Sequence, residues 1–160
     1  MTAKKQSPIK LKEIIAQANK LDVMSTYVVD AETKKIIKYN KVFDKSKVEE
    51  LTLELFEDMQ YAIANEYNFF ESDEQLIKYE LLLIVKYFTH FKDEIGDTFE
   101  DKINALEALM RTGLLDIIFE DVLDKDQVVD VIEQINKVAE RAILASDAIE
   151  KSLEVNGETN

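Results

Sequence analysis

The sequence predicts a mainly α-helical fold, a compact helical bundle of about five to six helices with one small N-terminal β-hairpin. Apolar residues recur at helical spacing over most of the 160 residues, and the pattern changes to β-branched and aromatic residues only around 25–39. Three Gly and one Pro leave little room for irregular structure. A hydrophobic content of 46% supplies the core of one domain of this length.

The first helix is expected to start at Ser7-Pro8. Ser is a common N-cap residue, and Pro suits the first helical position. The helix ends near Leu21, and its apolar positions recur at helical spacing: Leu11, Ile14, Ile15 and Ala18. Residues 1–7 are expected to form a flexible N-terminus.

A β-hairpin is predicted near residues 25–39. Residues 26–29 and 35–39 are rich in β-branched and aromatic side chains, and the polar residues 30–34 between them have hairpin length. Because an isolated two-stranded hairpin is marginal in water, it must pack on the helices or pair with another chain.

The remaining chain predicts five further helices. They end near Ala64, Phe91, Arg111, Val122 and Leu153. Their expected capping residues are Asp44 or Ser46, Ser72, Asp97, and Asp124 or Asp126. The helix that ends near Phe91 is apolar nearly all round, which predicts a central buried helix. We expect one helical domain over residues 8–153, with a flexible C-terminus over 154–160.

Charge is sorted along the chain. Residues 1–47 carry 11 Lys and 5 acidic residues, whereas residues 48–160 carry 9 basic and 28 acidic residues, within a net charge of −13. This balance disfavours direct nucleic-acid binding and favours a basic protein partner. The unlike-charged halves also make a homo-oligomer physically reasonable. With no Cys, no apolar run of membrane-spanning length and no signal-peptide pattern, we expect a cytoplasmic protein outside the membrane.

No catalytic residue, metal ligand or cofactor is predicted. His90 is the only His, and we interpret it as a helix-end residue, because a nucleophilic triad would have to use it and Cys is absent. Two clusters of acidic residues, near 93–101 and 120–130, lack the EF-hand spacing and are interpreted as solvated faces and caps. An enzyme is therefore not expected, although acid–base chemistry in a polar cleft stays open.

Aromatic and Lys side chains are the candidates for partner binding. The aromatic candidates lie in the hairpin and in the connector before residue 72, and their alternative role is to close the end of the bundle. The Lys candidates surround the second strand, and their alternative roles are protection of a strand edge or contact with acidic helices of another subunit. The candidate residues are Tyr27, Lys34, Lys35, Lys38, Tyr39, Lys41, Tyr67, Phe69 and Phe70.

Two stretches carry a resemblance. Residues 38–51 run from a basic and aromatic strand into a capped helix, and residues 106–116 form a helix–Gly–helix step. In this layout the chain resembles small tail assembly chaperones of phages that infect Gram-positive bacteria. The resemblance implies a non-enzymatic helper in the host cytoplasm that binds the helical tape-measure protein while the tail tube assembles. It transfers no functional residue.

An acidic phage-encoded inhibitor is the alternative. Such a protein would mimic nucleic acid or act against host defences by binding a basic host protein, and it needs acids spaced along one face like phosphates. The acids that raise this hypothesis lie on the polar side of one expected helix: Glu49, Glu50, Glu54, Glu57 and Asp58.

Overall fold

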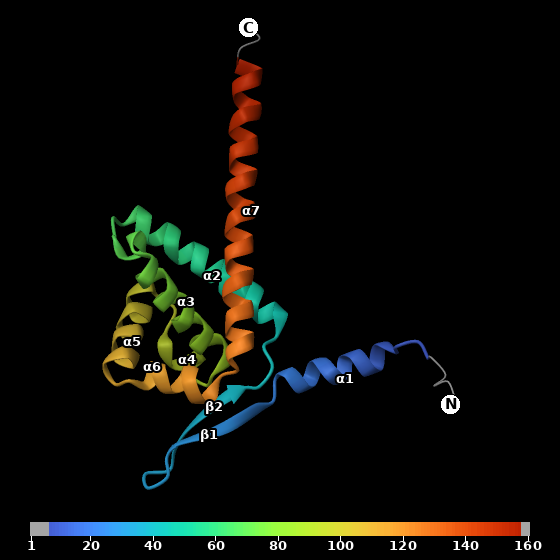
Figure 1. Cartoon of the computed structure of the whole chain (residues 1–160), viewed down its shortest axis with the longest axis vertical. Helices are drawn as coiled ribbons and strands as arrows, with labels where there is room; N and C mark the ends of the chain where they lie inside the picture. The colour runs from blue at the N-terminus through green and yellow to red at the C-terminus, as the bar shows by residue number, and fades with distance from the viewer. Residues whose placement is uncertain (1–6, 158–160) are drawn as a thin grey trace. The chain divides into compact units, whose positions relative to one another are not determined.

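The computed structural model describes residues 7–157, with side chains described as far as residue 147. It confirms a mainly α-helical fold with an antiparallel hairpin near the N-terminus (Figure 1). The chain divides into two compact units, Met1–Asp124 and Lys125–Asn160. The expected single domain over 8–153 stays a prediction, because this division does not decide whether either unit folds alone. The expected flexible ends lie largely outside the described residues.

Helix α1 spans Leu11–Leu21, so the expected start at Ser7-Pro8 is wrong. The N-cap position is Lys10, whose backbone N–H donates to the Glu13 carboxylate at 3.3 Å. This contact supports the helix start after the proline. All residues of 7–20 are exposed, including the expected apolar stripe.

The hairpin consists of β1, Met24–Asp30, and β2, Lys35–Asn40. Asp30 shapes the turn, because its Oδ1 accepts from the backbone N–H groups of Glu32 and Thr33 at 2.9 and 3.3 Å. The pairing places Tyr27 opposite Ile37, and Ile37 is buried. The hairpin therefore has one inward face and one exposed face.

The second edge of β2 is paired with the segment that follows helix α3. Tyr39 forms an antiparallel bridge with Thr89. The His90 N–H donates to the Lys38 carbonyl at 2.9 Å, and the Lys38 N–H donates to His90 Nδ1 at 3.2 Å. These bonds attach the hairpin to the helices, as its marginal stability requires.

Three long helices form the body of the first unit, and α3 contacts both of the others. They are α2, Lys45–Ala64; α3, Asp73–Phe88; and α5, Phe99–Arg111. The short elements are η1, Phe69–Glu71; α4, Lys92–Ile95; α6, Leu114–Ile117; and η2, Ile118–Val122.

Residues 82–86 of α3 are all buried, which confirms a central buried helix. Helix α3 ends at Phe88, before the expected Phe91, because the backbone at Thr89 turns extended to meet β2.

The helix caps decide between the two candidates for α2 and correct the expectation for α5. Asp44, rather than Ser46, caps α2, since its Oδ1 accepts from the Ser46 N–H at 2.9 Å. Thr98, rather than Asp97, caps α5, with its Oγ1 accepting from the Asp101 N–H at 3.1 Å. Both residues are short oxygen-bearing side chains of the kind that caps require.

The second unit consists of helix α7, Lys125–Gly157 within the described residues. It begins directly after Asp124, one of the two expected capping positions, and continues beyond the expected end at Leu153. No helix in the described part of the chain combines the length and the apolarity that crossing a bilayer requires.

Candidate partner-binding site

The aromatic connector between α2 and α3 packs against the body of the first unit. The rings of Phe69 and Phe70 meet Tyr79 edge-on, with centroid distances of 5.8 and 5.1 Å. Both rings also contact Phe99 of α5. Such aromatic packing agrees with the expected alternative that the connector closes one end of the bundle. Phe69 and Phe70 nevertheless stay half-buried, and Tyr67 is 45% exposed.

Glu100 holds two tyrosines at the surface beside this cluster. Its Oε1 accepts from the Tyr61 hydroxyl at 3.0 Å and from the Tyr67 hydroxyl at 3.1 Å. Its own amide and these hydroxyls hold the pKa of Glu100 below its usual value. The carboxylate therefore stays charged and fixes the orientation of both rings.

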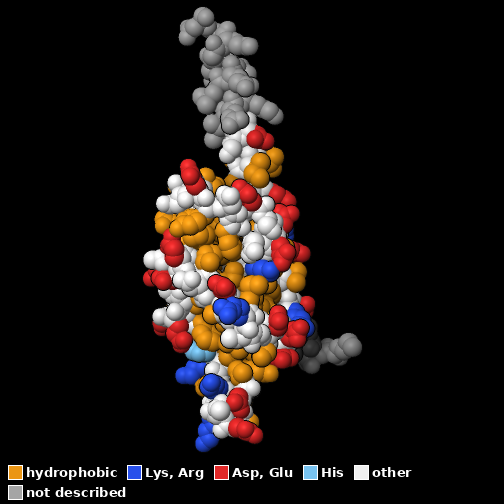
Figure 2. Space-filling view, turned by 90° about the vertical axis from the view of Figure 1, so that its left-hand side faces the viewer, with side chains coloured by type: hydrophobic (Ala, Val, Ile, Leu, Met, Phe, Trp, Pro, Cys, Tyr) orange, Lys and Arg blue, Asp and Glu red, His pale blue; other side chains and the backbone are white. Residues whose placement is uncertain are grey.

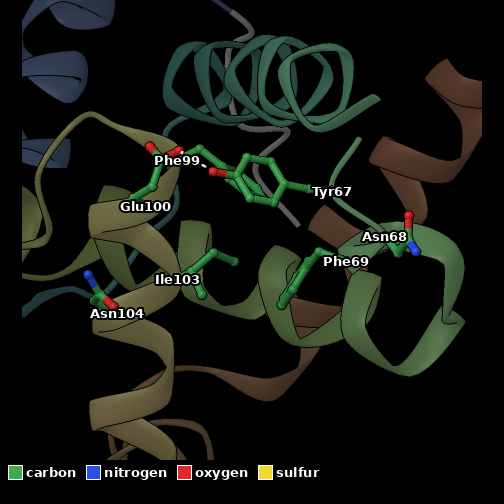
Figure 3. A pocket seen from close by; sticks show the side chains of 7 residues that line it. All are labelled: Tyr67, Asn68, Phe69, Phe99, Glu100, Ile103 and Asn104. Carbon is green, nitrogen blue, oxygen red and sulfur yellow. Dashed lines mark hydrogen bonds between the residues drawn. The ribbon is translucent and has the colours of Figure 1, made fainter. Parts of the chain in front are cut away.

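Three adjoining hollows surround the connector, and together we call them the connector groove. The first has a volume of about 360 Å³ and is lined by residues 67–69 and by Phe99, Glu100, Ile103 and Asn104 of α5. Figure 3 shows Tyr67, Phe69 and Ile103 turned toward this space. The second, about 230 Å³, shares Phe69 and Ile103 and continues along α5 to Met110. The third, about 320 Å³, shares Tyr67 and Asn68 and lies by the C-terminal end of α2.

The connector groove is apolar at its floor and acidic at its rim. Among the residues that line the three hollows there are four acids and no Lys or Arg, the acids being Glu66, Glu71, Glu100 and Glu107. Figure 2 shows hydrophobic side chains gathered among acidic ones on the face that carries α5. A groove of this kind suits an amphipathic helix that has apolar anchors and flanking basic residues.

The Lys-rich hairpin is a separate surface. Lys34, Lys35, Lys38 and Lys41 are all exposed, and Figure 2 shows basic side chains at the hairpin. Tyr27 and Tyr39 are half-buried on the inward face. The hairpin leads into the N-terminal end of α2, whereas the groove lies beyond its C-terminal end, and a 20-residue helix is about 30 Å long. The structure therefore does not bring the two sets of candidates together, and their roles stay predictions.

A buried ion-pair network links α2, α3 and α5. Lys102 Nζ lies 2.7 Å from Asp58 Oδ2 and 2.5 Å from Glu54 Oε1. Lys86 Nζ lies 2.8 Å from Glu54 Oε1 and 3.1 Å from Asp97. The hydroxyls of two tyrosines complete the network: Tyr79 donates to Asp58 and Tyr87 donates to Glu54. A fully partnered network of this kind stabilises and specifies the packing of the helices.

The pKa values follow from these contacts. Burial alone would raise the pKa of Glu54, but hydrogen bonds from Lys102, Lys86 and Tyr87 outweigh it and hold the pKa below its usual value. Burial and the bond to Asp58 raise the pKa of Tyr79 far above its usual range. Glu54 is therefore ionised, and Tyr79 is neutral, around neutral pH.

Sequence reasoning missed this network. Glu54 and Asp58 were expected on a solvated polar face, and the structure turns them inward; Glu49, Glu50 and Glu57 alone of that set are exposed. Three of these five acids on α2 are thus exposed, and the inhibitor hypothesis stays a prediction. The available signal was Lys86, the one charged residue among the apolar and aromatic residues 81–88 of α3. The described side chains contain no group of three or more His, Cys, Asp and Glu residues that could hold a metal ion.

A family model described as YomO matches residues 11–158, nearly the whole chain and both units. No curated protein and no solved structure matches.

Proposed function

The chain belongs to the YomO family, and from this premise we propose that it is a non-enzymatic phage morphogenesis factor that holds an apolar helix of a partner protein in the connector groove. The family is one of a Bacillus phage region, which supports a phage-encoded role. The partner that the resemblance to tail assembly chaperones implies is the tape-measure protein, a long helical protein whose apolar surface needs cover before the tail tube encloses it.

The observation that carries this proposal is the half-exposed apolar floor of the connector groove. Met110 is 41% exposed and Tyr67 is 45% exposed, and Ile103 between them is half-buried. Neighbouring apolar side chains that a monomer leaves open to water mark interaction sites more often than they serve stability. The acidic rim selects a partner helix with Lys or Arg beside its apolar stripe.

Co-expression with the tape-measure protein of the same phage region tests the proposal. We expect the full chain to raise the soluble yield of the tape-measure protein and to co-purify with it. Met110→Gln and Ile103→Gln should remove most of this effect, because each places a polar group on the groove floor. Leu53→Gln is the matched control, since Leu53 is also exposed, at 64%, and lies outside the groove.

Two results would count against the proposal. One is a tape-measure protein whose solubility does not change when the wild-type chain is present. The other is full activity of both groove variants, which would place the partner elsewhere, such as at the Lys-rich hairpin.

A further inference from the structure

Helix α1 presents an apolar stripe that the described residues of its own unit leave uncovered. Leu11 is 70% exposed, Ile14 is 50% exposed and Ile15 is 52% exposed. These residues share one side of the helix, at the spacing by which a helix docks in a groove. Lys10 and Lys12 flank the stripe. Apolar side chains grouped in this way on a basic helix favour an acidic, apolar binding surface.

Helix α1 cannot reach the connector groove of its own chain. Its C-terminal end is fixed beside the start of α2, where Asn40 Nδ2 donates to the Leu21 carbonyl at 3.0 Å and Lys47 pairs with Asp22 at 3.7 Å. Leu11 lies about 15 Å back along α1, whereas Met59, the first groove residue of α2, lies about 18 Å beyond Lys47 along α2. The stripe of one chain therefore meets a groove only in another chain.

The stripe matches the second hollow of the groove in length, and the groove rim in charge. Leu11 to Ala18 covers eight residues of helix, a rise of about 10 Å, and the α5 residues that line the second hollow, from Ile103 to Met110, cover the same length. The Lys residues that flank the stripe would face the acidic rim, of which Glu107 is part. Unlike charges of this kind orient the docking helix.

We propose that α1 of one copy docks in the connector groove of a second copy. The contact is head-to-tail, so each copy offers one α1 and one free groove, and copies join into open chains or closed rings. This inference shares the groove with the proposed function but needs no phage partner. Where the phage partner of the proposed function is present, α1 of a second copy covers the groove until the partner helix displaces it.

Sedimentation velocity of the purified full chain tests this self-association. We expect the average mass to rise with protein concentration up to about 100 μM, and the association to weaken at least tenfold between about 0.05 and about 0.5 M NaCl. Ile14→Gln in α1 and Met110→Gln in the groove should each sediment as monomers, while Leu53→Gln should associate like the wild type. Far-UV circular dichroism establishes that each variant is folded.

Mixing the two monomeric variants gives the sharpest result. The Met110→Gln chain still has an intact α1 and the Ile14→Gln chain still has an intact groove, so an equimolar mixture should form a dimer and nothing larger. A wild-type chain that is monomeric throughout would overturn the inference. Association of Met110→Gln alone, as pairing between two α1 helices would give, or a mixture that stays monomeric, would also overturn it. Because no tape-measure protein is present, this test can fail while the proposed function stands.

Discussion

Replacing Lys102 by Met should destabilise the first unit more than any substitution of a surface Lys. The side chain of Lys102 is 2% exposed, and its Nζ neutralises both Asp58 and Glu54, whose side chains are only 11% and 15% exposed. Met keeps much of the volume of Lys and removes the charge. The variant therefore leaves two buried carboxylates without their shared cation.

The size of the effect follows from the remaining contacts. Removing one member of a buried ion pair costs about 3 to 5 kcal/mol. We expect the lower end, about 3 kcal/mol, because Glu54 keeps Lys86 and Asp58 keeps the Tyr79 hydroxyl. A loss of about 3 kcal/mol lowers the melting temperature by about 6 to 12 °C for a chain of this size.

Urea unfolding followed by near-ultraviolet circular dichroism measures this loss in the right unit. All six Tyr and all eight Phe precede residue 125, so the aromatic signal reports on the first unit alone. Lys78→Met is the control, since Lys78 pairs with Glu74 on the surface of α3, and its midpoint should stay close to that of the wild type. A Lys102→Met variant that loses less than about 1 kcal/mol would refute the assigned role of the network.

Three further predictions concern buried or constrained positions. Burial raises the pKa of Glu80 to about 7, so between its usual pKa and 7 the Glu80 carboxyl is protonated in the folded state and ionised in the unfolded state. The free energy of unfolding should therefore fall by about 3 kcal/mol as pH rises through this range. Urea titrations at several pH values measure this fall, and Glu80→Gln should abolish it. His90→Leu removes the acceptor for the Lys38 N–H. For a bond worth about 1 kcal/mol, hydrogen exchange at that amide should speed up roughly fivefold, whereas His90→Asn should retain part of the protection. Gly96→Ala should lower the melting temperature, because Gly96 has φ of +82° and an added Cβ would lie 2.8 Å from the Asp101 Cβ. An unchanged melting curve would contradict this interpretation of the turn.

Local pattern was sufficient for most of the fold. The hairpin near 25–39, the helix that ends at Ala64 and the central buried helix all follow from short-range signals of spacing, β-branching and capping chemistry. The errors lie at element ends. Helix α3 ends at Phe88 rather than Phe91 because residues 89 and 90 pair with β2, a partner about 50 positions away in sequence that no local pattern records.

Only part of the candidate site could be predicted from the sequence. The sequence singled out Tyr67, Phe69 and Phe70 because aromatic residues in a connector need an explanation, and the structure places them around a groove. The sequence alone could not predict that Ile103 and Met110 of α5 line the groove, because they do so only where α5 packs beside α3. Hydrophobic residues at helical spacing look alike whether a neighbouring helix covers them or leaves them open.

By itself, then, the sequence determined the helical class, the hairpin, and the sorting of charge into a basic start and an acidic remainder, because spacing and composition are properties of neighbours along the chain. Tertiary structure alone decided which charged residues face inward and which apolar residues face water. Glu54 and Asp58 are buried because Lys86 and Lys102 come from other helices to neutralise them. The stripe of α1 stays exposed because no described residue of its own unit covers it. Burial depends on which elements meet, and that is fixed by the packing of the whole unit.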